Sequence, residues 1–313
     1  MNGVVGDSPV VALRGLGRMF GSVPAVDGLT FDVARGELFG IVGPDGAGKT
    51  TTLRMLAGVL PPTAGDAEIL GVSVGRDPEG VKPHLSYMAQ RFGLYHDLTV
   101  RENLLFYADL YRVPREVRPD RLQRLYRFSR LGEFEDRLAG QLSGGMKQKL
   151  ALSCALFHEP AVLLLDEPTF GVDPISRREL WLILHRMVAD GMTIVMTTSY
   201  MDEAERCDRI ALLDGGRVLA LDRPARIQER LADRLLSVSA DAPRAALNVL
   251  RRRDDVRRAM LFGDAVHVVV APGVGPDVIR AALADAGVTA TVQTARPSLE
   301  DAFMELVGGG SDG

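Results

Sequence analysis

The sequence GPDGAGKTTT, at residues 43–52, decides the fold because of what stands on either side of it. The apolar run LFGIV at 38–42 precedes it and predicts a buried strand, and Leu53, Leu56 and Ala57 follow it with helical spacing. The segment matches the pattern G-x-x-x-x-G-K-[ST] in the strand-loop-helix context that this pattern requires. A glycine turn with a chance lysine is the alternative, and the joint presence of strand, motif and helix speaks against it.

Such a loop predicts a cradle for a polyphosphate. Its glycines let successive backbone N–H groups point at the anion, and the following helix presents its positive end. Lys49 would supply a charge for the β- and γ-phosphates, and the hydroxyl of Thr50 is the usual ligand for Mg²⁺. The sequence therefore predicts nucleotide binding. We assign the cradle to Gly43, Pro44, Asp45, Gly46, Ala47, Gly48, Lys49, Thr50 and Thr51.

The composition is that of a globular protein. The 313 residues predict about two domains, with 46% hydrophobic and 25% charged residues. The net charge of −4 gives no reason to expect nucleic acid. No apolar run approaches the ~18 residues that span a bilayer, and the sequence MNGVVGDSP lacks a signal pattern. We therefore expect a cytoplasmic protein whose contact with a membrane passes through a partner.

The two cysteines carry no chemistry in this interpretation. Cys154 and Cys207 are far apart in the sequence and lack metal-ligand spacing. We expect both to be reduced thiols without a catalytic role.

Before residue 100 the sequence predicts mainly short strands. The segment 10–32 is rich in β-forming residues, and glycine and proline separate short segments between 61 and 83. Phe20 ends an early strand, where it is either a core aromatic or a side chain that stacks on an adenine ring. Gln90 stands where another predicted strand ends.

The segment 100–140 is arginine-rich and helical, and Thr99 and Glu102 predict a capping box at its start. Its basic run RPDRLQRLYRFSR could bind nucleic acid or form the solvated face of a helix. Acidic residues interleave the arginines without a domain-wide positive charge, which favours the solvated face.

The sequence LSGGMKQKL at 142–150 predicts a helix whose N-terminus carries almost no side chains. Ser143, Gly144 and Gly145 form that end, which can bind an anion brought from elsewhere. An ordinary capped helix is the alternative, and this segment alone leaves it open.

Two further apolar runs predict buried parallel strands. AVLLLDEP at 161–168 contains Asp166 and Glu167, and TIVMTTS at 193–199 ends in Ser199. Because ligands of open α/β sheets gather at the carboxyl ends of strands, these side chains belong near the phosphate loop. Asp166 suits a contact to Mg²⁺, and Glu167 suits a base that orients or deprotonates the attacking water. Capping of the next turn is the alternative.

The rest of the chain predicts a helix and a separate module. Ser176 and Glu179 predict a capping box for a helix that runs to about 188. From about 231 the pattern is β-α-β-β-α-β, the order of a ferredoxin-like module, followed by a short closing helix. His267 alternates with valines, so we expect it at the surface or at an edge. The tail 308–313 is expected to be flexible.

With the loop, Gln90, LSGGMKQ and LLLDEP in this order, residues from about 9 to 230 resemble the ATP-binding cassette (ABC) ATPases. The resemblance is to the cytosolic nucleotide-binding subunits of ABC-2-type exporters. It implies an α/β fold, with a RecA-like phosphate-loop NTPase core and antiparallel β and helical subdomains. The expected domains are the cassette at 1–230, its helical subdomain at about 91–160, and a ferredoxin-like α+β domain at 231–307.

The resemblance also implies roles at the nucleotide. Phe20 matches the aromatic that stacks on the adenine of ATP, and 43–51 match the phosphate loop. Gln90 matches the glutamine that senses Mg²⁺ and the attacking water. Asp166 and Glu167 match the metal aspartate and the catalytic glutamate.

Two partners follow from the same resemblance. Ser143, Gly144 and Gly145 match the signature that contacts the γ-phosphate held by a second cassette in a head-to-tail dimer, and Asp173 matches an aspartate of that interface. The loop after Gln90 would face a transmembrane permease, which places the protein at the inner face of the membrane.

One position departs from the family pattern. Where the family has TTH-x-M-x-E-A, this chain has TTSYMDEA, so Ser199 replaces the histidine that reaches the γ-phosphate. Loss of one donor to developing charge lowers turnover by a factor on the order of 10² to 10³. We therefore predict that ATP and Mg²⁺ bind well here and that hydrolysis is slow.

The same serine occurs in sequences that are similar to the first cassette of tandem multidrug-exporter ATPases, whose second cassette keeps the histidine. Residues 308–313 would then begin a linker or end the gene. The leading hypothesis is the motor of an exporter, and the alternative is a regulatory module that binds ATP without useful hydrolysis. A cassette acting on ribosomes or DNA is disfavoured, because the chain has no coiled-coil insertion or long charged segment.

Overall fold

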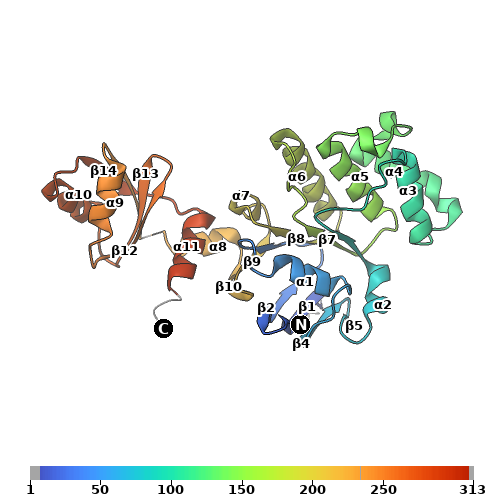
Figure 1. The fold of residues 1–313 in the computed structure, drawn as a ribbon, viewed down its shortest axis with the longest axis horizontal. Helices are drawn as coiled ribbons and strands as arrows, with labels where there is room; N and C mark the ends of the chain where they lie inside the picture. Colours follow the sequence, from blue (N-terminus) through green and yellow to red (C-terminus); the bar gives the residue numbers. More distant parts are fainter. Residues whose placement is uncertain (1–7, 233, 310–313) are drawn as a thin grey trace, which may run out of the picture. The chain divides into compact units, whose positions relative to one another are not determined.

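The computed structural model describes residues 8–232 and 234–309. Contacts divide the chain after Leu221 into two compact units, which are described separately. The first unit contains two sheets and a group of helices, and the second contains a third sheet with its own helices (Figure 1).

The centre of the first unit is a six-stranded sheet in the order β10-β9-β3-β8-β7-β6. The pairs β9–β3, β3–β8, β8–β7 and β7–β6 are parallel. The apolar runs at 38–42 and 162–166 are buried along their whole length, as expected for central strands covered on both faces. The strands are β3 (Leu38–Val42), β6 (Leu85–Met88), β7 (Val162–Asp166), β8 (Thr193–Thr198), β9 (Arg209–Asp214) and β10 (Arg217–Asp222).

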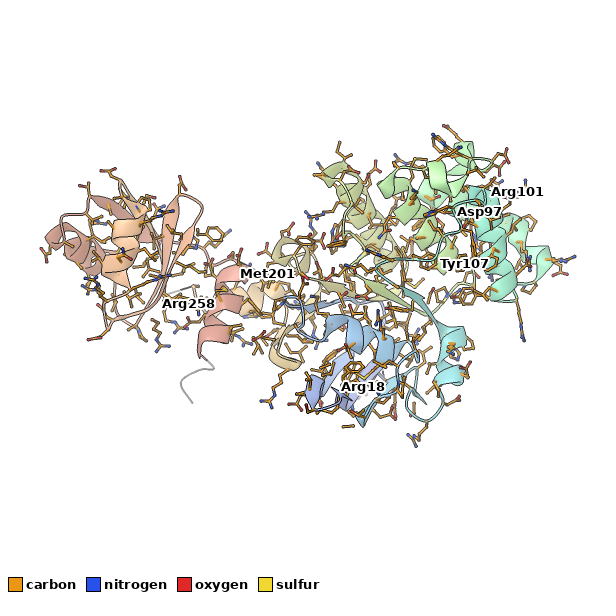
Figure 2. All side chains as sticks on the ribbon, viewed as in Figure 1. Arg18, Asp97, Arg101, Tyr107, Met201 and Arg258 are labelled. Carbon is orange, nitrogen blue, oxygen red and sulfur yellow. The ribbon has the colours of Figure 1, made fainter. Side chains whose placement is uncertain are left out.

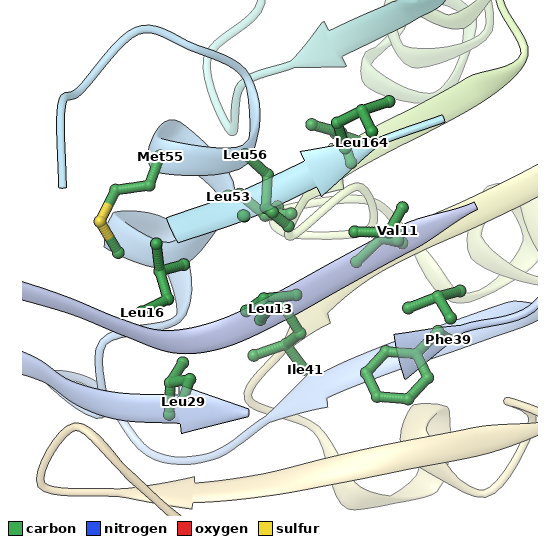
Figure 3. Close-up of a cluster of buried hydrophobic side chains, with 14 of the residues drawn as sticks. Val11, Leu13, Leu16, Leu29, Phe39, Ile41, Leu53, Met55, Leu56 and Leu164 are labelled. Atoms are coloured by element: carbon green, nitrogen blue, oxygen red, sulfur yellow. The ribbon is translucent and has the colours of Figure 1, made fainter. Parts of the chain in front are cut away.

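A second, four-stranded sheet in the order β2-β1-β4-β5 shares its core with the first sheet and with helix α1. Leu13 and Leu16 of β1, Ile41 of β3 and Leu53 of α1 belong to this core (Figure 3). Burial of their side chains therefore fixes α1 and the loop before it against both sheets. The elements are β1 (Val11–Phe20), β2 (Val23–Val33), β4 (Ala64–Ile69), β5 (Val72–Ser73) and α1 (Lys49–Leu56).

A helical part between 92 and 157 has its own hydrophobic cluster. Arg101 and Tyr107 lie on its first helix, α3 (Figure 2). The capping box predicted at Thr99 and Glu102 is present at the start of this helix. The helices are α3 (Val100–Leu110), α4 (Arg118–Ser129) and α5 (Gly144–Leu156), with 3-10 turns η2 (Arg115–Val117), η3 (Gly132–Phe134) and η4 (Ala139–Gln141).

The remaining helices of the first unit connect strands of its two sheets. Both cysteines are free and buried, and burial raises the pKa of each thiol, which suits the expectation of unreactive side chains. The helices that connect the strands of the two sheets are α2 (Pro78–Val81), η1 (Lys82–His84), α6 (Pro174–Ala189) and α7 (Met201–Ala204).

The second unit has the element order β-α-β-β-α-β that the sequence predicts, in a sheet ordered β12-β13-β11-β14. The pairs β12–β13, β13–β11 and β11–β14 are antiparallel, and both helices α9 and α10 contribute to the core of this unit. The elements are α8 (Pro224–Glu229), β11 (Leu235–Ala240), α9 (Pro243–Leu250), β12 (Val256–Phe262), β13 (Ala265–Val270), α10 (Pro276–Asp285), β14 (Ala290–Thr294) and α11 (Leu299–Gly309).

Three details differ from the sequence expectations. The division after Leu221 comes before the expected boundary at 230, because α8 packs against α11. Helix α11 extends through Gly309, so the expected flexible tail does not begin at Gly308, and 310–313 lie outside the described residues. The surface or edge position expected for His267 is wrong, because β13 lies between β12 and β11. Its imidazole stacks on Phe262 and lies 2.8 Å from the Asp301 carboxylate.

No helix within 8–232 or 234–309 is long and apolar enough to cross a bilayer.

Candidate nucleotide site

The phosphate loop is shaped by close contacts with the rest of the chain. A Cβ at Gly43 would lie 2.2 Å from the carbonyl oxygen of Leu213, and one at Gly48 would lie 2.4 Å from that of Ala25. Gly48 also has φ +94°, a left-handed conformation that glycine adopts without the steric cost of a side chain. The loop can therefore hold its path only with glycine at these two positions.

Lys49 begins α1 and is almost fully buried. Its Nζ donates to the backbone carbonyls of Gly43 at 2.8 Å and Pro44 at 3.0 Å, and to the Ser199 hydroxyl at 2.8 Å. It also lies 3.4 Å from a carboxylate oxygen of Glu167. The loop thus concentrates a positive charge at the end of the sheet where β7 and β8 deliver their polar residues.

Glu167 is held from three sides. Its backbone N–H donates to the Thr197 hydroxyl at 2.9 Å, and its carboxylate accepts from Gln90 Nε2 at 2.9 Å and from the Ser199 hydroxyl at 2.8 Å. Glu167 has φ +47°, a strained conformation for a residue with a side chain, which costs ~1–2 kcal/mol. Such strain persists only where surrounding contacts determine the position, which is common at functional sites.

Asp166 forms a second carboxylate centre beside the loop. Its Oδ1 accepts from the hydroxyls of Thr50 at 2.9 Å and Thr197 at 2.8 Å, and its Oδ2 accepts from the Tyr87 hydroxyl at 3.2 Å. Burial, with the charge of Asp166 as a further cause, raises the pKa of Tyr87 to about 12, so that it remains a donor.

Two residues in these contacts, Tyr87 and Thr197, have no role predicted from the sequence. Tyr87 lies on β6, and Thr197 faces Asp166 in the parallel register of β7 and β8. Only strand pairing brings the two hydroxyls to Asp166. The Thr-Thr pair before Ser199 is a sequence signal for Thr197, but no pattern identifies Tyr87 as a donor.

The loop, Gln90 and Glu167 line one pocket of about 470 Å³. Phe20, expected at the adenine, is about half exposed on β1, with the guanidinium of Arg18 at 4.9 Å from its ring centre. It is not among the residues that line this pocket. The lining residues are Ala25, Asp45, Gly46, Gly48, Lys49, Thr50, Thr51, Gln90, Glu167 and Phe170.

The SGG segment lies at the start of α5, and its residues differ in their surroundings. The Ser143 hydroxyl accepts from the N–H of Met146 and caps the helix. Gly145 is buried, and a Cβ there would lie 2.1 Å from the Ser176 hydroxyl, whereas one at Gly144 would meet nothing within 4 Å. Ser143 therefore caps the helix, packing requires glycine at 145, and Gly144 faces open space.

Asp173 is the N-cap of α6, where it accepts from the N–H groups of Ile175 and Ser176. The capping box predicted for Ser176 and Glu179 is wrong, because the helix begins at Pro174 and Glu179 pairs with Lys149 of α5. The bond from the Ser176 N–H, above all, lowers the pKa of Asp173 below its usual value.

A phosphate loop beside an aspartate and a glutamate at the end of a parallel sheet defines a nucleotide-binding protein of the phosphate-loop class. A family model described as ABC transporter matches residues 26–170. The Nod factor export ATP-binding protein I of Rhizobium leguminosarum bv. viciae is 35% identical over 304 residues, which cover 96% of this chain and 96% of that protein. The chain therefore belongs to the ABC transporter family, among its ATP-binding proteins.

A longer relative is the probable multidrug ABC transporter ATP-binding protein YbhF of Escherichia coli, which is 44% identical over 304 residues. The match covers 96% of this chain and 52% of that protein, so the chain spans about half its length. Among solved structures, an ATP-binding subunit of an ABC transporter has a TM-score of 0.64 and 31% identity, covering 71% of this chain and 92% of that one. The dimeric post-hydrolysis state of an ATP-binding cassette bound to ADP and Pi has a TM-score of 0.61 and 26% identity, covering 68% and 98%.

Proposed function

We propose that this chain is the ATP-hydrolysing motor subunit of an exporter. The observation that carries the proposal is that Lys49, Gln90 and Glu167 line one pocket together with the phosphate loop. Ser199 contacts two of these residues, Lys49 and Glu167. The family of the chain and the name of its Rhizobium relative, a Nod factor export ATP-binding protein, support export as the direction of transport. A separate transmembrane permease would select the cargo. The same permease would hold this subunit at the cytoplasmic face of the membrane.

The residues of the site suit the steps of ATP hydrolysis. The N–H groups of the loop and the charge of Lys49 would bind the phosphates. Glu167, with one oxygen held by Gln90, would orient and deprotonate the attacking water. Phe20 would stack on adenine, since its exposed ring is available to a ligand.

The residues present also fit Mg²⁺. Among residues 8–232 and 234–309, no three acidic, His or Cys side chains form a metal-binding group. Mg²⁺ does not need one, because it keeps several waters and binds through one or two carboxylates together with substrate phosphates. The Thr50 hydroxyl and the Asp166 carboxylate are adjacent at 2.9 Å and would hold it, with Gln90 nearby. When bound, the ion neutralises charge that develops on the phosphates.

The open end of α5 supports a second cassette as partner. Ser143 and Gly144 are exposed, and a Cβ at Gly144 would meet no atom of this chain. We infer that they contact the γ-phosphate bound by the other cassette in a head-to-tail sandwich, with Gly145 behind them and Asp173 at the interface. The length of the E. coli relative, about twice the matched segment, supports a tandem partner as an alternative to a homodimer.

Ser199 is the reason to expect slow hydrolysis. Its hydroxyl lies 2.8 Å from both Lys49 Nζ and a Glu167 oxygen, so it is engaged by the two groups beside it. A hydroxyl on a single carbon is too short to take over the reach of a histidine toward the γ-phosphate. We therefore infer a site that binds ATP and turns it over slowly.

The decisive test measures steady-state ATP hydrolysis by the purified chain and its Ser199→His variant. We expect a gain on the order of 10²-fold in the variant, with ATP affinity little changed. A Ser199→His/Glu167→Gln double variant is the control, because it keeps the histidine and removes the base. Brisk, equal rates in wild type and Ser199→His would contradict a degenerate site.

The second candidate is a regulatory module that closes on ATP without useful hydrolysis. The observation that favours it is again the serine at 199. Glu167→Gln separates the two functions: a loss of turnover relative to wild type supports the motor, and turnover already at background in wild type supports the module.

A further inference from the structure

Glu203 is a buried carboxylate that the proposed hydrolysis does not use. It lies on α7, whose first residue, Met201, is labelled in Figure 2, and it is 1% exposed. The hydroxyl of Thr169 donates to Oε1 at 2.6 Å and that of Thr198 to Oε2 at 2.8 Å. Arg177 Nε lies 3.4 Å from Oε1 as an ion pair. A buried charge is tolerated only when it is paired and hydrogen-bonded, and these three contacts satisfy that condition.

The three contacts come from three segments of the site. Thr169 follows Glu167 by two positions, and Thr198 directly precedes Ser199. Arg177 lies on α6, the helix that Asp173 caps. One carboxylate therefore joins the segments that carry the proposed base, the serine beside Lys49 and the proposed interface aspartate.

Two of these partners also hold the turn around Ser199. The Thr198 hydroxyl accepts from the N–H of Tyr200 at 3.0 Å, and the Arg177 guanidinium lies 4.6 Å from the centre of the Tyr200 ring. The residues on both sides of Ser199 are thus tied to Glu203 or to its ion-pair partner. Ser199 in turn contacts Glu167.

The network reaches α5 through the segment between Glu167 and Thr169. The side-chain amide of Gln148, on α5, donates to the carbonyl of Pro168. A shift of α5 would therefore move the backbone whose next residue, Thr169, is bonded to Glu203.

We propose that Glu203 is a positioning residue that couples the turn 198–200 to the segment 167–173, so that Ser199 and Glu167 keep their mutual geometry during turnover. The proposal rests on the proposed function for its effect on hydrolysis. Bonds to a charged group in a buried site are stronger than neutral ones, and their members reinforce one another. A group with this role does not touch the nucleotide, so its loss should affect turnover more than ATP binding.

The test compares Glu203→Gln with Asp202→Asn, which removes the same charge from the neighbouring, exposed position on α7. We expect Glu203→Gln to lower kcat ~10-fold with KM for ATP within ~2-fold, and Asp202→Asn to change neither. Glu203→Asp, which keeps the charge at shorter reach, should recover part of kcat. Equal loss in kcat and in ATP affinity, or no loss in either, would overturn the proposal.

Amide hydrogen exchange provides a reading that does not depend on hydrolysis. Thr169→Val removes one hydroxyl and leaves the Glu203–Arg177 ion pair in place. We expect faster exchange at 198–200 as well as at 167–173, and no change in α1. Faster exchange confined to 167–173 would show that the two segments are not coupled. If wild type hydrolyses no ATP, the proposed function fails and this measurement alone decides the role of Glu203.

Discussion

Two glycine-containing turns precede helices of the cassette, and their glycines have different surroundings. In the loop before α1, Gly43 and Gly48 would each drive a Cβ into a backbone carbonyl, at 2.2 and 2.4 Å. At the start of α5, Gly145 faces the side chain of Ser176, and Gly144 faces open space. The first turn is thus fixed by its own chain, whereas one glycine of the second has no structural requirement within the residues described.

The contrast distinguishes a glycine that the fold requires from a glycine that a bound ligand requires. Whether the chain itself requires a glycine is tested by measuring how an alanine substitution changes the free energy of unfolding. An open glycine near a helix N-terminus leaves backbone N–H groups accessible, and its requirement can come only from what binds there.

Gly48→Ala should have the largest effect. A left-handed φ of +94° and the overlap with the Ala25 carbonyl together cost about 2–5 kcal/mol. Denaturant unfolding measures this loss. Gly46→Ala is the matched control, because Gly46 also has a positive φ of +84° but a Cβ there meets nothing within 4 Å. Equal losses at both positions would mean that the contact with β2 contributes nothing.

Gly145→Ala should cost less, because the obstacle is a side chain. The added methyl would lie 2.1 Å from the Ser176 hydroxyl and 2.4 Å from its Cβ, an overlap that costs ~1–3 kcal/mol. Ser176→Gly in the same chain removes both atoms, and we expect it to restore part of the lost stability. An unchanged melting temperature in the single variant would show that α5 and α6 adjust without cost.

Gly144→Ala should leave the isolated chain intact. Alanine favours the helix, so the free energy of unfolding should be unchanged or rise by ~0.5–1 kcal/mol. Under the proposed sandwich, ATP turnover by the complete assembly should nevertheless fall. Comparison of this variant with Gly145→Ala therefore distinguishes a glycine required by a bound ligand from a glycine required by packing. A destabilised chain, or full turnover in the assembly, would contradict the distinction.

Asp173→Asn should have the smallest effect, and it should depend on pH. The Ser176 N–H lowers the folded-state pKa of Asp173, so its ionised form contributes stability above the ordinary carboxyl pKa of ~3.9 and loses it as pH falls. The stability difference between wild type and variant should therefore be largest near neutral pH and vanish in acid. Urea unfolding of both proteins near neutral pH and in acid checks this. A stability difference that is the same at both pH values would assign the effect to the amide itself.

Local patterns predicted much of the fold. The apolar runs at 38–42 and 162–166 became buried parallel strands, and the Thr99–Glu102 capping box formed as expected. These predictions succeeded because burial on both faces and N-terminal capping depend on residues that are close in the sequence. They failed where a distant partner competed, as when Lys149 took Glu179 from its expected cap and Asp301 paired with His267.

Sequence patterns alone identify the phosphate loop, the acidic pair after β7, the serine at 199 in place of histidine, and the family that these motifs resemble. The hydroxyls that reach the buried carboxylates are recognised only in the folded chain. Thr197 and Tyr87 meet at Asp166, and Thr169 and Thr198 meet at Glu203, from strands and loops far apart in the chain. The physical reason is that a hydrogen bond requires about 3 Å between donor and acceptor, and no spacing in the sequence specifies that distance across a sheet.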